Sequence, residues 1–300
     1  MKQVGDVEQD IYTVLDSSVD HDPSPEKAAE YAMRIGGEMA KATRPRSSER
    51  ESGKLWASDL GESCNRKTYY KFCEPDKAAP LMGHTKFKFL YGNILEEAAL
   101  YLAEEAGHKV TYQQEPVKLD ILDDDWQVSG RIDAVIDGVL VDVKSTSSFG
   151  YKKYSKEGLN ATNDSFGYLW QLGYYHNFMP TTYRNPDEAG FLWIDKQNGH
   201  LLYQDVTPEL PSESELHHRI FDKIKVIDKE EEPERKFLPV PEGKSGNMKL
   251  DTKCSYCDFK KHCWRDANGG TGLRTFLYNW GPVSLTEVKR EPRVPEINDA

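Results

Sequence analysis

The chain has 300 residues, of which 38% are hydrophobic and 30% are charged, and its net charge is −11. That length suits one large domain with appendages or two modest domains. No apolar run approaches the roughly 18 residues of a membrane-spanning helix, and the N-terminal stretch MKQVGDVEQD lacks the features of a signal peptide. We therefore expect a cytoplasmic protein with no membrane partner. The acidic balance counts against non-specific coating of nucleic acid, although a binding groove needs only a local basic patch.

The first 54 residues are expected to form a helical appendage and a linker. Ser24 is a good N-cap and Pro25 suits the first helical position, so a helix is predicted from Pro25 to Thr43. The polar run over residues 44–53 is the expected linker. One domain is expected over residues 55–280, followed by a mobile tail over residues 281–300.

Helical and strand patterns alternate within that domain. Helices are predicted at about 91–106, 166–178 and 212–228, and strands between 110 and 144, at 190–195 and at 200–206. This order indicates an α/β fold. The charged, Pro- and Gly-rich stretch over residues 229–247 is expected to be a surface connection.

The stretch VSGRIDAVIDGVLVDVKS, residues 128–145, carries the chemistry. Asp137-Gly138 between two β-rich runs predicts a two-residue hairpin turn, in which Ile136 faces Val139. Asp133 then lies opposite Asp142, and Lys144 shares their face because side chains alternate along a strand. The other face is apolar and is expected to pack on the core.

Two carboxylates directly across a strand pair repel each other, so something must offset their charge. A divalent cation bridging Asp133 and Asp142 would do so, since Mg²⁺ prefers oxygen ligands. Such a metal activates water and neutralises a phosphate oxygen, while Lys144 would orient that water or stabilise developing charge. The alternative is an exposed hairpin whose acids are neutralised by Lys144 and water.

Further candidates lie on the predicted helices. Periodicity places Glu96 at the flank of the apolar face and Glu97 on the solvated side, so Glu96 is the better third metal ligand; a plain boundary glutamate is the alternative. Gln171 and Tyr175 are four residues apart and share a helix face. They suit phosphate binding or ordering of the lysine, although a surface pair is the commoner explanation.

The five cysteines indicate metal ligation, because disulfides are rare in a reducing compartment. Cys254, Cys257 and Cys263 form a C-terminal trio, and a fourth ligand would come from Cys64 or Cys73. Four thiolates suit either Zn²⁺ or a [4Fe–4S] cluster. His262 is a competing zinc ligand, and spacing alone leaves both metals open.

Six motifs in order resemble the iron–sulfur branch of the PD-(D/E)XK nuclease superfamily, RecB-like exonucleases that include the fourth Cas protein of CRISPR adaptation and phage relatives. The resemblance covers about residues 55–264. The matching residues are Ser58-Asp59-Leu60 before Cys64, Gly92 and Glu96, Gly130 and Asp133, Asp142-Val143-Lys144, Gln171 and Tyr175, and the trio that ends at Cys263.

The resemblance implies a restriction-endonuclease-like central mixed sheet flanked by helices, with a helical subregion stapled by a [4Fe–4S] cluster on Cys64, Cys254, Cys257 and Cys263. It implies that Glu96, Asp133, Asp142 and the Val143 carbonyl hold Mg²⁺ or Mn²⁺. Lys144 is then the catalytic lysine, with Gln171 and Tyr175 as accessory residues. Many family members carry His in place of Glu96, which puts the choice between Mg²⁺ and Mn²⁺ in doubt.

The resulting expectation is a metal-dependent deoxyribonuclease, an exonuclease on single-stranded DNA ends. Basic and aromatic clusters at residues 66–71, 152–156 and 253–265 support DNA as the partner. The alternatives are a structure-selective endonuclease and a catalytically silent DNA-binding adaptor. The adaptor would belong to a recombination or CRISPR-adaptation complex, and a recombination, repair or CRISPR-adaptation protein is a further expected partner.

Overall fold

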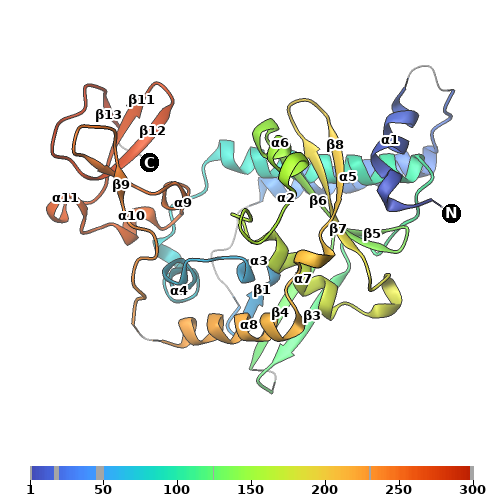
Figure 1. The fold of residues 1–300 in the computed structure, drawn as a ribbon, viewed down its shortest axis with the longest axis horizontal. Helices are drawn as coiled ribbons and strands as arrows, with labels where there is room; N and C mark the ends of the chain where they lie inside the picture. The colour runs from blue at the N-terminus through green and yellow to red at the C-terminus, as the bar shows by residue number, and fades with distance from the viewer. Residues whose placement is uncertain (1, 17–19, 45–50, 124, 230, 298–300) are drawn as a thin grey trace. The chain divides into compact units, whose positions relative to one another are not determined.

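The computed structural model describes residues 2–16, 20–44, 51–123, 125–229 and 231–297 (Figure 1). The chain divides into two compact units, each built from separate stretches of sequence. The larger unit comprises residues 1–47, 51–61 and 82–220, and the smaller unit comprises residues 48–50, 62–81 and 221–300. These boundaries differ from the expected division at residues 54 and 280, because segments distant in sequence pack together in both units.

The larger unit is built on a mixed five-stranded sheet in the order β2-β5-β6-β7-β8. The strands are β2 (Val110–Thr111), β5 (Ala134–Ile136), β6 (Val139–Thr146), β7 (Ala189–Asp195) and β8 (Leu201–Asp205). β6 and β7 are parallel, whereas the β5–β6 and β7–β8 pairs are antiparallel. The expected mixed sheet with flanking helices is confirmed.

Both faces of this sheet are covered, and every residue of β7 is buried. On one face, Val141 and Val143 pack in a single apolar cluster with side chains of α1 (Val7–Leu15) and α5 (Gly83–Glu105). On the other face, Trp193 stacks on Tyr154 of α6 (Ser148–Glu157), with ring centroids 4.2 Å apart. Burial on both sides explains why β7 reads as a continuous apolar run instead of an alternating one.

A second, three-stranded sheet adjoins the first within the larger unit, in the order β1-β4-β3. Its strands are β1 (Lys54–Trp56), β3 (Pro116–Ile121) and β4 (Trp126–Arg131). Tyr174 of α7 (Tyr168–Phe178) donates its hydroxyl to the Val128 carbonyl at 2.8 Å. That bond ties α7 to the strand that leads into the β5–β6 hairpin. The short helices α3 (Ala57–Leu60), η1 (Val4–Asp6), η3 (Thr181–Tyr183) and η4 (Thr207–Glu209) complete this unit.

The N-terminal helices are part of the core, so the expected appendage is wrong. α2 (Pro25–Thr43) has the predicted bounds, and the Ser24 hydroxyl accepts from the Lys27 amide at 3.3 Å. Tyr31 on α2 is 3% exposed and packs against Tyr101 of α5, with ring centroids 5.6 Å apart. The apolar stripe of α2 is covered because α5 offers it a matching face. Residues 45–50 of the predicted linker lie outside the described residues.

The other predicted helices are present with shifted ends. α5 begins at Gly83, eight residues before its expected start, and α7 begins at Tyr168. α8 (Glu213–Asp228) follows Ser212, whose backbone amide donates to the Glu215 carboxylate at 2.8 Å while the Glu215 amide donates to the Ser212 hydroxyl at 3.3 Å. This reciprocal cap fixes the predicted start of α8. No helix in the described ranges is both long and apolar enough to cross a membrane.

The smaller unit combines short helices with a five-stranded sheet in the order β13-β11-β12-β10-β9. Its elements are α4 (Asn65–Cys73), η2 (Pro75–Lys77), β9 (Val240–Pro241), β10 (Met248–Lys249), α9 (Thr252–Ser255), α10 (Lys260–Cys263), α11 (Ala267–Gly270), β11 (Arg274–Tyr278), β12 (Gly281–Glu287) and β13 (Glu296–Ile297). The expected tail over residues 281–300 is therefore wrong for its described part, because β12 pairs with both β11 and β10.

Candidate active site and candidate cysteine centre

The β5–β6 hairpin forms as predicted from Asp137-Gly138. Both turn residues have positive φ, 51° and 87°, as a two-residue turn between twisted strands requires. Ile136 pairs with Val139 and Ala134 pairs with Val141. The regular ladder ends at Ala134, one residue short of the expected pairing between Asp133 and Asp142.

Asp133, Asp142 and Lys144 nevertheless come together. The Asp133 carboxylate accepts a hydrogen bond from the Val143 amide at 2.8 Å, so the side chain continues the contact where the ladder stops. The Lys144 ammonium forms an ion pair with Asp142 and lies 3.8 Å from the Asp133 carboxylate. Asp142 is 2% exposed. The predicted convergence of two acids and one lysine is therefore present in the structure.

Burial and mutual repulsion disfavour the charged forms of Asp133 and Glu96. Burial, followed by repulsion from Asp142, raises the pKa of Asp133 to about 7, despite opposing contributions from Lys144 and the Val143 amide. Burial, followed by repulsion from Asp133, raises the pKa of Glu96 to about 9. Burial alone would lower the pKa of Lys144, but Asp142 and Asp133 outweigh it and raise that pKa. Glu96 thus belongs to the same electrostatic group as the two aspartates.

Glu96 and Asp133 line one cavity of about 160 Å³. Gln114, which the sequence did not single out, lies between them: its side chain donates to Glu96 at 2.9 Å and its amide donates to the Asp133 carbonyl at 3.2 Å. Gln114 has a positive φ of 57°, and Tyr112 in the same turn has a φ of 53°. Left-handed backbone at two non-glycine residues in one turn is costly and is found preferentially at functional sites.

Glu97 was expected on the solvated side of its helix and is instead 6% exposed. The reason is α2, which covers this flank of α5: Asn93 of α5 donates to Glu38 of α2 at 2.7 Å. Burial raises the pKa of Glu97, against the attraction of Arg34. Helical periodicity could not reveal this because it assumed one buried face on α5.

Gln171 and Tyr175 interact on α7, as their spacing predicted. The Gln171 amide donates to the Tyr175 hydroxyl at 3.2 Å, and Tyr175 is 3% exposed. Burial raises the pKa of Tyr175 to about 12, and the charges of Asp142, Asp133 and Lys144 all act on its hydroxyl. A second aromatic residue of α7, Tyr168, lies with its ring centroid 5.8 Å from the Lys144 ammonium and was not predicted.

The acidic group fits a divalent cation chemically, although its side chains do not yet surround one. Within the described ranges, no three His, Cys, Asp or Glu side chains form a group that could hold a metal ion as they stand. However, Asp142 Oδ1 is buried without a hydrogen-bond partner among the described residues. A buried carboxylate oxygen left unpaired is costly, and a hard cation is the partner that suits it. No contact tests the Val143 carbonyl as a ligand, which stays a prediction.

The predicted cysteine ligands all belong to the smaller unit. Cys64 caps α4, Cys254 lies in α9, Cys263 ends α10, and Cys257 lies between the last two. Cys257 and Cys263 pack in an apolar cluster with Tyr70 and Phe259. Cys254 packs in a neighbouring cluster around Leu250 and Trp264. The trio therefore packs among aromatic residues that the cysteine spacing alone did not identify.

The four thiols act on one another electrostatically. Burial raises the pKa of Cys254 to about 12 and that of Cys257 to about 11, and in both cases Cys64 adds to the increase. Burial also raises the pKa of Cys263, opposed by Arg66 and by Arg235. Cys73 takes no part, because its thiol is exposed and donates to the Ile227 carbonyl at 3.4 Å. Burial and mutual repulsion thus favour the neutral thiols, and no three of the described cysteines form a group that could hold a metal ion as they stand.

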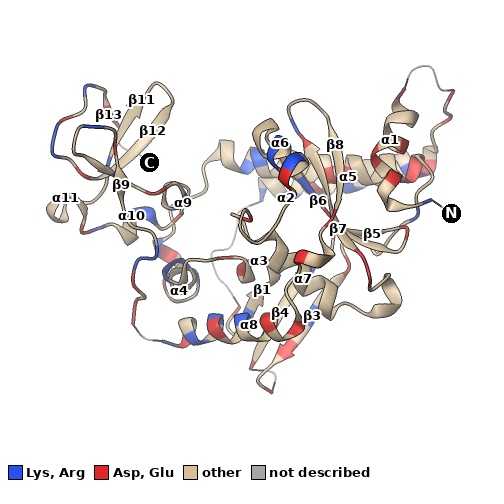
Figure 2. Ribbon diagram, viewed as in Figure 1, with Lys and Arg blue, Asp and Glu red and all other residues tan. Residues whose placement is uncertain are grey.

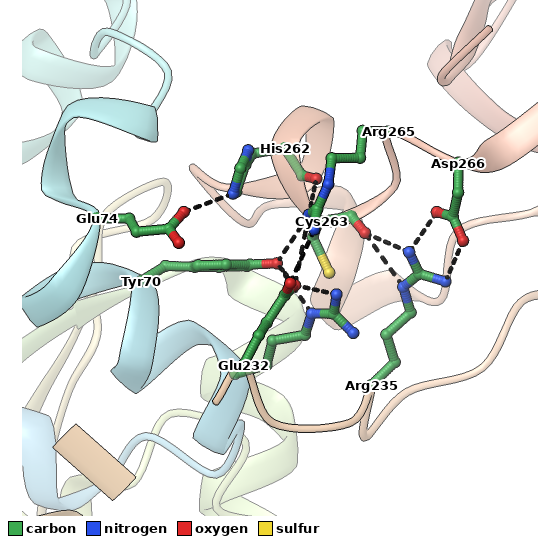
Figure 3. A network of polar contacts seen from close by, with 9 residues as sticks. Tyr70, Glu74, Glu232, Arg235, His262, Cys263, Arg265 and Asp266 are labelled. Atoms are coloured by element: carbon green, nitrogen blue, oxygen red, sulfur yellow. Dashed lines mark hydrogen bonds and ion pairs between the residues drawn. The ribbon is translucent and has the colours of Figure 1, made fainter. Parts of the chain in front are cut away.

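A polar network surrounds Cys263 (Figure 3). Glu232 accepts hydrogen bonds from Tyr70 and Arg66 and from Arg265, the last at 2.8 Å. His262, the competing zinc ligand by sequence, turns its ring to Glu74, with the Nε2 to Oε2 distance at 2.7 Å.

The same network anchors the chain before the trio. The Arg235 guanidinium donates to the Cys263 carbonyl, at 3.1 Å from Nε, and pairs with Asp266. The expected surface connection over residues 229–247 is therefore fastened beside the cysteines through Glu232 and Arg235.

Comparisons with known proteins give weak structural likenesses. No protein-family model matches the sequence, and no curated protein matches it. Among solved structures, SSO0001 is 14% identical, covers 76% of this chain and 93% of its own, and has a TM-score of 0.47. An alkaline exonuclease from Laribacter hongkongensis is 16% identical over 59% of this chain and 89% of its own, with a TM-score of 0.42. The structure of this exonuclease, LHK-Exo, in complex with dAMP is 15% identical to this chain and has a TM-score of 0.41, with the same coverage. At scores this low, these likenesses assign neither a family nor a function.

Proposed function

We propose that the protein is a metal-dependent nuclease that hydrolyses DNA phosphodiester bonds, acting as an exonuclease on single-stranded ends. One observation carries the proposal: Asp133, Asp142 and Lys144 meet beside a cavity that Glu96 also lines. The buried Asp142, two partly buried acids and a lysine would provide both a cation site and a donor for a phosphate oxygen.

Each residue has a distinct part in this reaction. Asp133, Asp142 and Glu96 would hold Mg²⁺ or Mn²⁺, with Gln114 keeping the Glu96 carboxylate in place through its 2.9 Å hydrogen bond. When bound, the metal supplies an activated water and neutralises phosphate charge. Lys144, held by Asp142, donates to the phosphate oxygen that gains charge during attack. Tyr175, which accepts a hydrogen bond from Gln171 on α7, lies within electrostatic reach of Asp133, Asp142 and Lys144.

The four thiols support a second part of the proposal, a structural [4Fe–4S] cluster on Cys64, Cys254, Cys257 and Cys263. The proposal is supported by the cations Arg66, Lys67 and Arg235, which lower the pKa values of Cys257 or Cys263 and would offset the negative charge of thiolate ligands. Such a centre would join α4 to the C-terminal trio within the smaller unit, across a large separation in sequence.

The experiment is digestion of 5′- and 3′-labelled linear single-stranded DNA with Mg²⁺ or Mn²⁺. We expect cleavage by the wild type, loss of at least 100-fold in Lys144→Ala, in the range of a lost oxyanion-type donor, and unchanged cleavage in Lys118→Ala, an exposed lysine on β3. Equal cleavage by wild type and Lys144→Ala would reject the assignment.

Two controls separate the rival functions. A circular single strand stays intact with a strict exonuclease, so its cleavage would identify an endonuclease instead. A wild-type protein that binds DNA without cleaving it under any of these conditions would be an adaptor.

A further inference from the structure

The β11–β12 hairpin of the smaller unit exposes an aromatic pair at its tip. Tyr278 pairs with Gly281, so Asn279 and Trp280 form the turn. The Trp280 side chain is 76% exposed, and its ring stacks on that of Tyr278 with centroids 4.9 Å apart and an interplanar angle of 28°. A tryptophan held by a tight turn outside the core gains little from burial, which marks it as a candidate contact for a partner.

A cationic cavity adjoins this pair. Tyr278 is one wall of a cavity of about 290 Å³ whose basic lining residues are Lys244, Arg290 and Arg293. All three are exposed, and none has an ion-pair partner among the described residues. Arg274 on β11, by contrast, is neutralised by Glu291 at 2.7 Å and by Glu296 at 2.6 Å. Three cations without internal partners in one place favour an anionic ligand.

The acidic residues of this cavity are already engaged. Glu291 is the partner of Arg274. The Glu242 carboxylate accepts from the Ser245 hydroxyl at 2.9 Å and also bonds Tyr278. Glu242 keeps its charge because its partners are neutral hydroxyls, so three cations in the lining face one carboxylate that no ion pair neutralises among the described residues.

The loop that carries the arginines is fixed in place. Asn247 is 1% exposed, and its side-chain oxygen accepts from the Lys289 amide at 2.8 Å and from the Arg290 amide at 2.9 Å. Its side-chain amide donates to the Arg290 carbonyl at 2.8 Å. A fixed backbone lowers the entropy lost when a ligand binds.

The charge of this part of the chain is opposite to that of the whole. Residues 240–297 contain ten Lys and Arg against seven Asp and Glu, whereas the full chain carries −11. Figure 2 shows basic positions in blue and acidic positions in red along the loops of this sheet. The local excess of positive charge fits a polyanion.

We propose that Tyr278, Trp280, Lys244, Arg290 and Arg293 form a second binding surface, for single-stranded nucleic acid. A base stacks on the exposed ring of Trp280, while the three cations contact backbone phosphates. A duplex would hide the faces of its bases, so the exposed ring of Trp280 favours a single strand. Only the choice of DNA as the ligand rests on the proposed nuclease function.

The test measures binding without cleavage. Lys144→Ala full-length protein in chelator is titrated against fluorescently labelled oligo(dT), and anisotropy gives the affinity. Adding Trp280→Ala is expected to weaken binding roughly 5- to 150-fold, the range that corresponds to about 1–3 kcal/mol for one stacked base. Adding Arg290→Ala with Arg293→Ala should also weaken binding and reduce the salt-dependence slope by about 1.4.

Matched controls keep the test specific. Leu277→Ala removes an exposed apolar side chain on the same strand, and Lys289→Ala removes a neighbouring cation that pairs with Glu287 at 3.4 Å. Both should bind like the parent. The proposal is overturned if Trp280→Ala binds as the parent does, or if a duplex of the same length binds more tightly than the single strand. Because the parent is already cleavage-deficient, neither result depends on whether the nuclease assignment holds.

Discussion

Gly130 and Tyr175 approach each other so closely that a Cβ at position 130 would lie 2.6 Å from the tyrosine hydroxyl. The same Cβ would lie 2.9 Å from the Cβ of Ala57, so an added side chain would be too close to both residues. Gly130 is the penultimate residue of β4 and lies three residues before Asp133. The glycine of the Gly130–Asp133 motif is thus required by the α7 tyrosine that packs on it.

Gly130→Ala is therefore expected to lower the free energy of unfolding by about 1–3 kcal/mol, as overpacking does, and to reduce cleavage because Tyr175 and Asp133 shift. Chemical denaturation and the DNA digestion assay measure the two effects. The control is Gly36→Ala in α2, where an added Cβ meets nothing within 4 Å; it should stabilise the protein by up to about 1 kcal/mol. Wild-type stability in Gly130→Ala would contradict the packing described here.

Gln114→Ala tests the hydrogen bond that holds Glu96. Losing one hydrogen bond worth about 1 kcal/mol should raise the half-saturating Mn²⁺ concentration for cleavage roughly 5- to 10-fold. Gln113→Ala is the matched control, because Gln113 bonds Tyr31 of α2 instead. A metal titration that shifts equally in both variants would mean that Gln114 acts only through the turn.

Cys64→Ser distinguishes the predicted ligand from the exposed thiol of Cys73. Protein purified without air should be brown, with bound iron and sulfide; Cys64→Ser should lose both and be less stable, while Cys73→Ser should keep them. Visible absorbance and metal analysis measure the difference. A colourless wild-type protein that contains zinc would contradict the cluster.

Ionisation of Glu232 is expected to make the free energy of unfolding depend on pH. Burial alone would raise its pKa, but hydrogen bonds from Arg265 and Tyr70 and the charge of Arg66 outweigh it and lower the pKa to about 2. Because the pKa of Glu232 is lower in the folded state than its ordinary value of 4.5, its charged form stabilises the folded state at pH values above 4.5. This contribution is lost as the pH falls from about 4.5 to about 2.

Glu232→Gln should accordingly cost on the order of 2–3 kcal/mol at pH 7, and the difference from wild type should shrink as the pH falls below about 4.5. Urea denaturation at several pH values measures it. Glu234→Gln, an exposed neighbour, should show no such trend. A pH-independent difference for Glu232→Gln would show that the loss is steric.

Local patterns predicted the parts of the fold that depend on neighbouring residues. The Asp137-Gly138 turn set the register of β5 and β6, and with it the convergence of Asp133, Asp142 and Lys144. The Ser24-Pro25 pair set the start of α2. These features follow from backbone geometry within a few residues, so the sequence contains them directly.

Long-range packing accounts for what the sequence did not reveal. Glu97 is buried because α2 covers a second flank of α5, and β12 is ordered because it pairs with β10, more than thirty residues earlier. Gln114 lies in a turn and belongs to no periodic pattern or motif, so the sequence did not identify it. Positions of this kind depend on contacts between distant segments, which periodicity in one segment cannot report.

Calorimetric titration with Mn²⁺ tests most directly whether Asp133 and Asp142 hold a divalent cation. The wild type should show a site that is lost in both Asp133→Asn and Asp142→Asn, with the fold retained in each by circular dichroism. Undiminished Mn²⁺ binding in both variants would contradict the account.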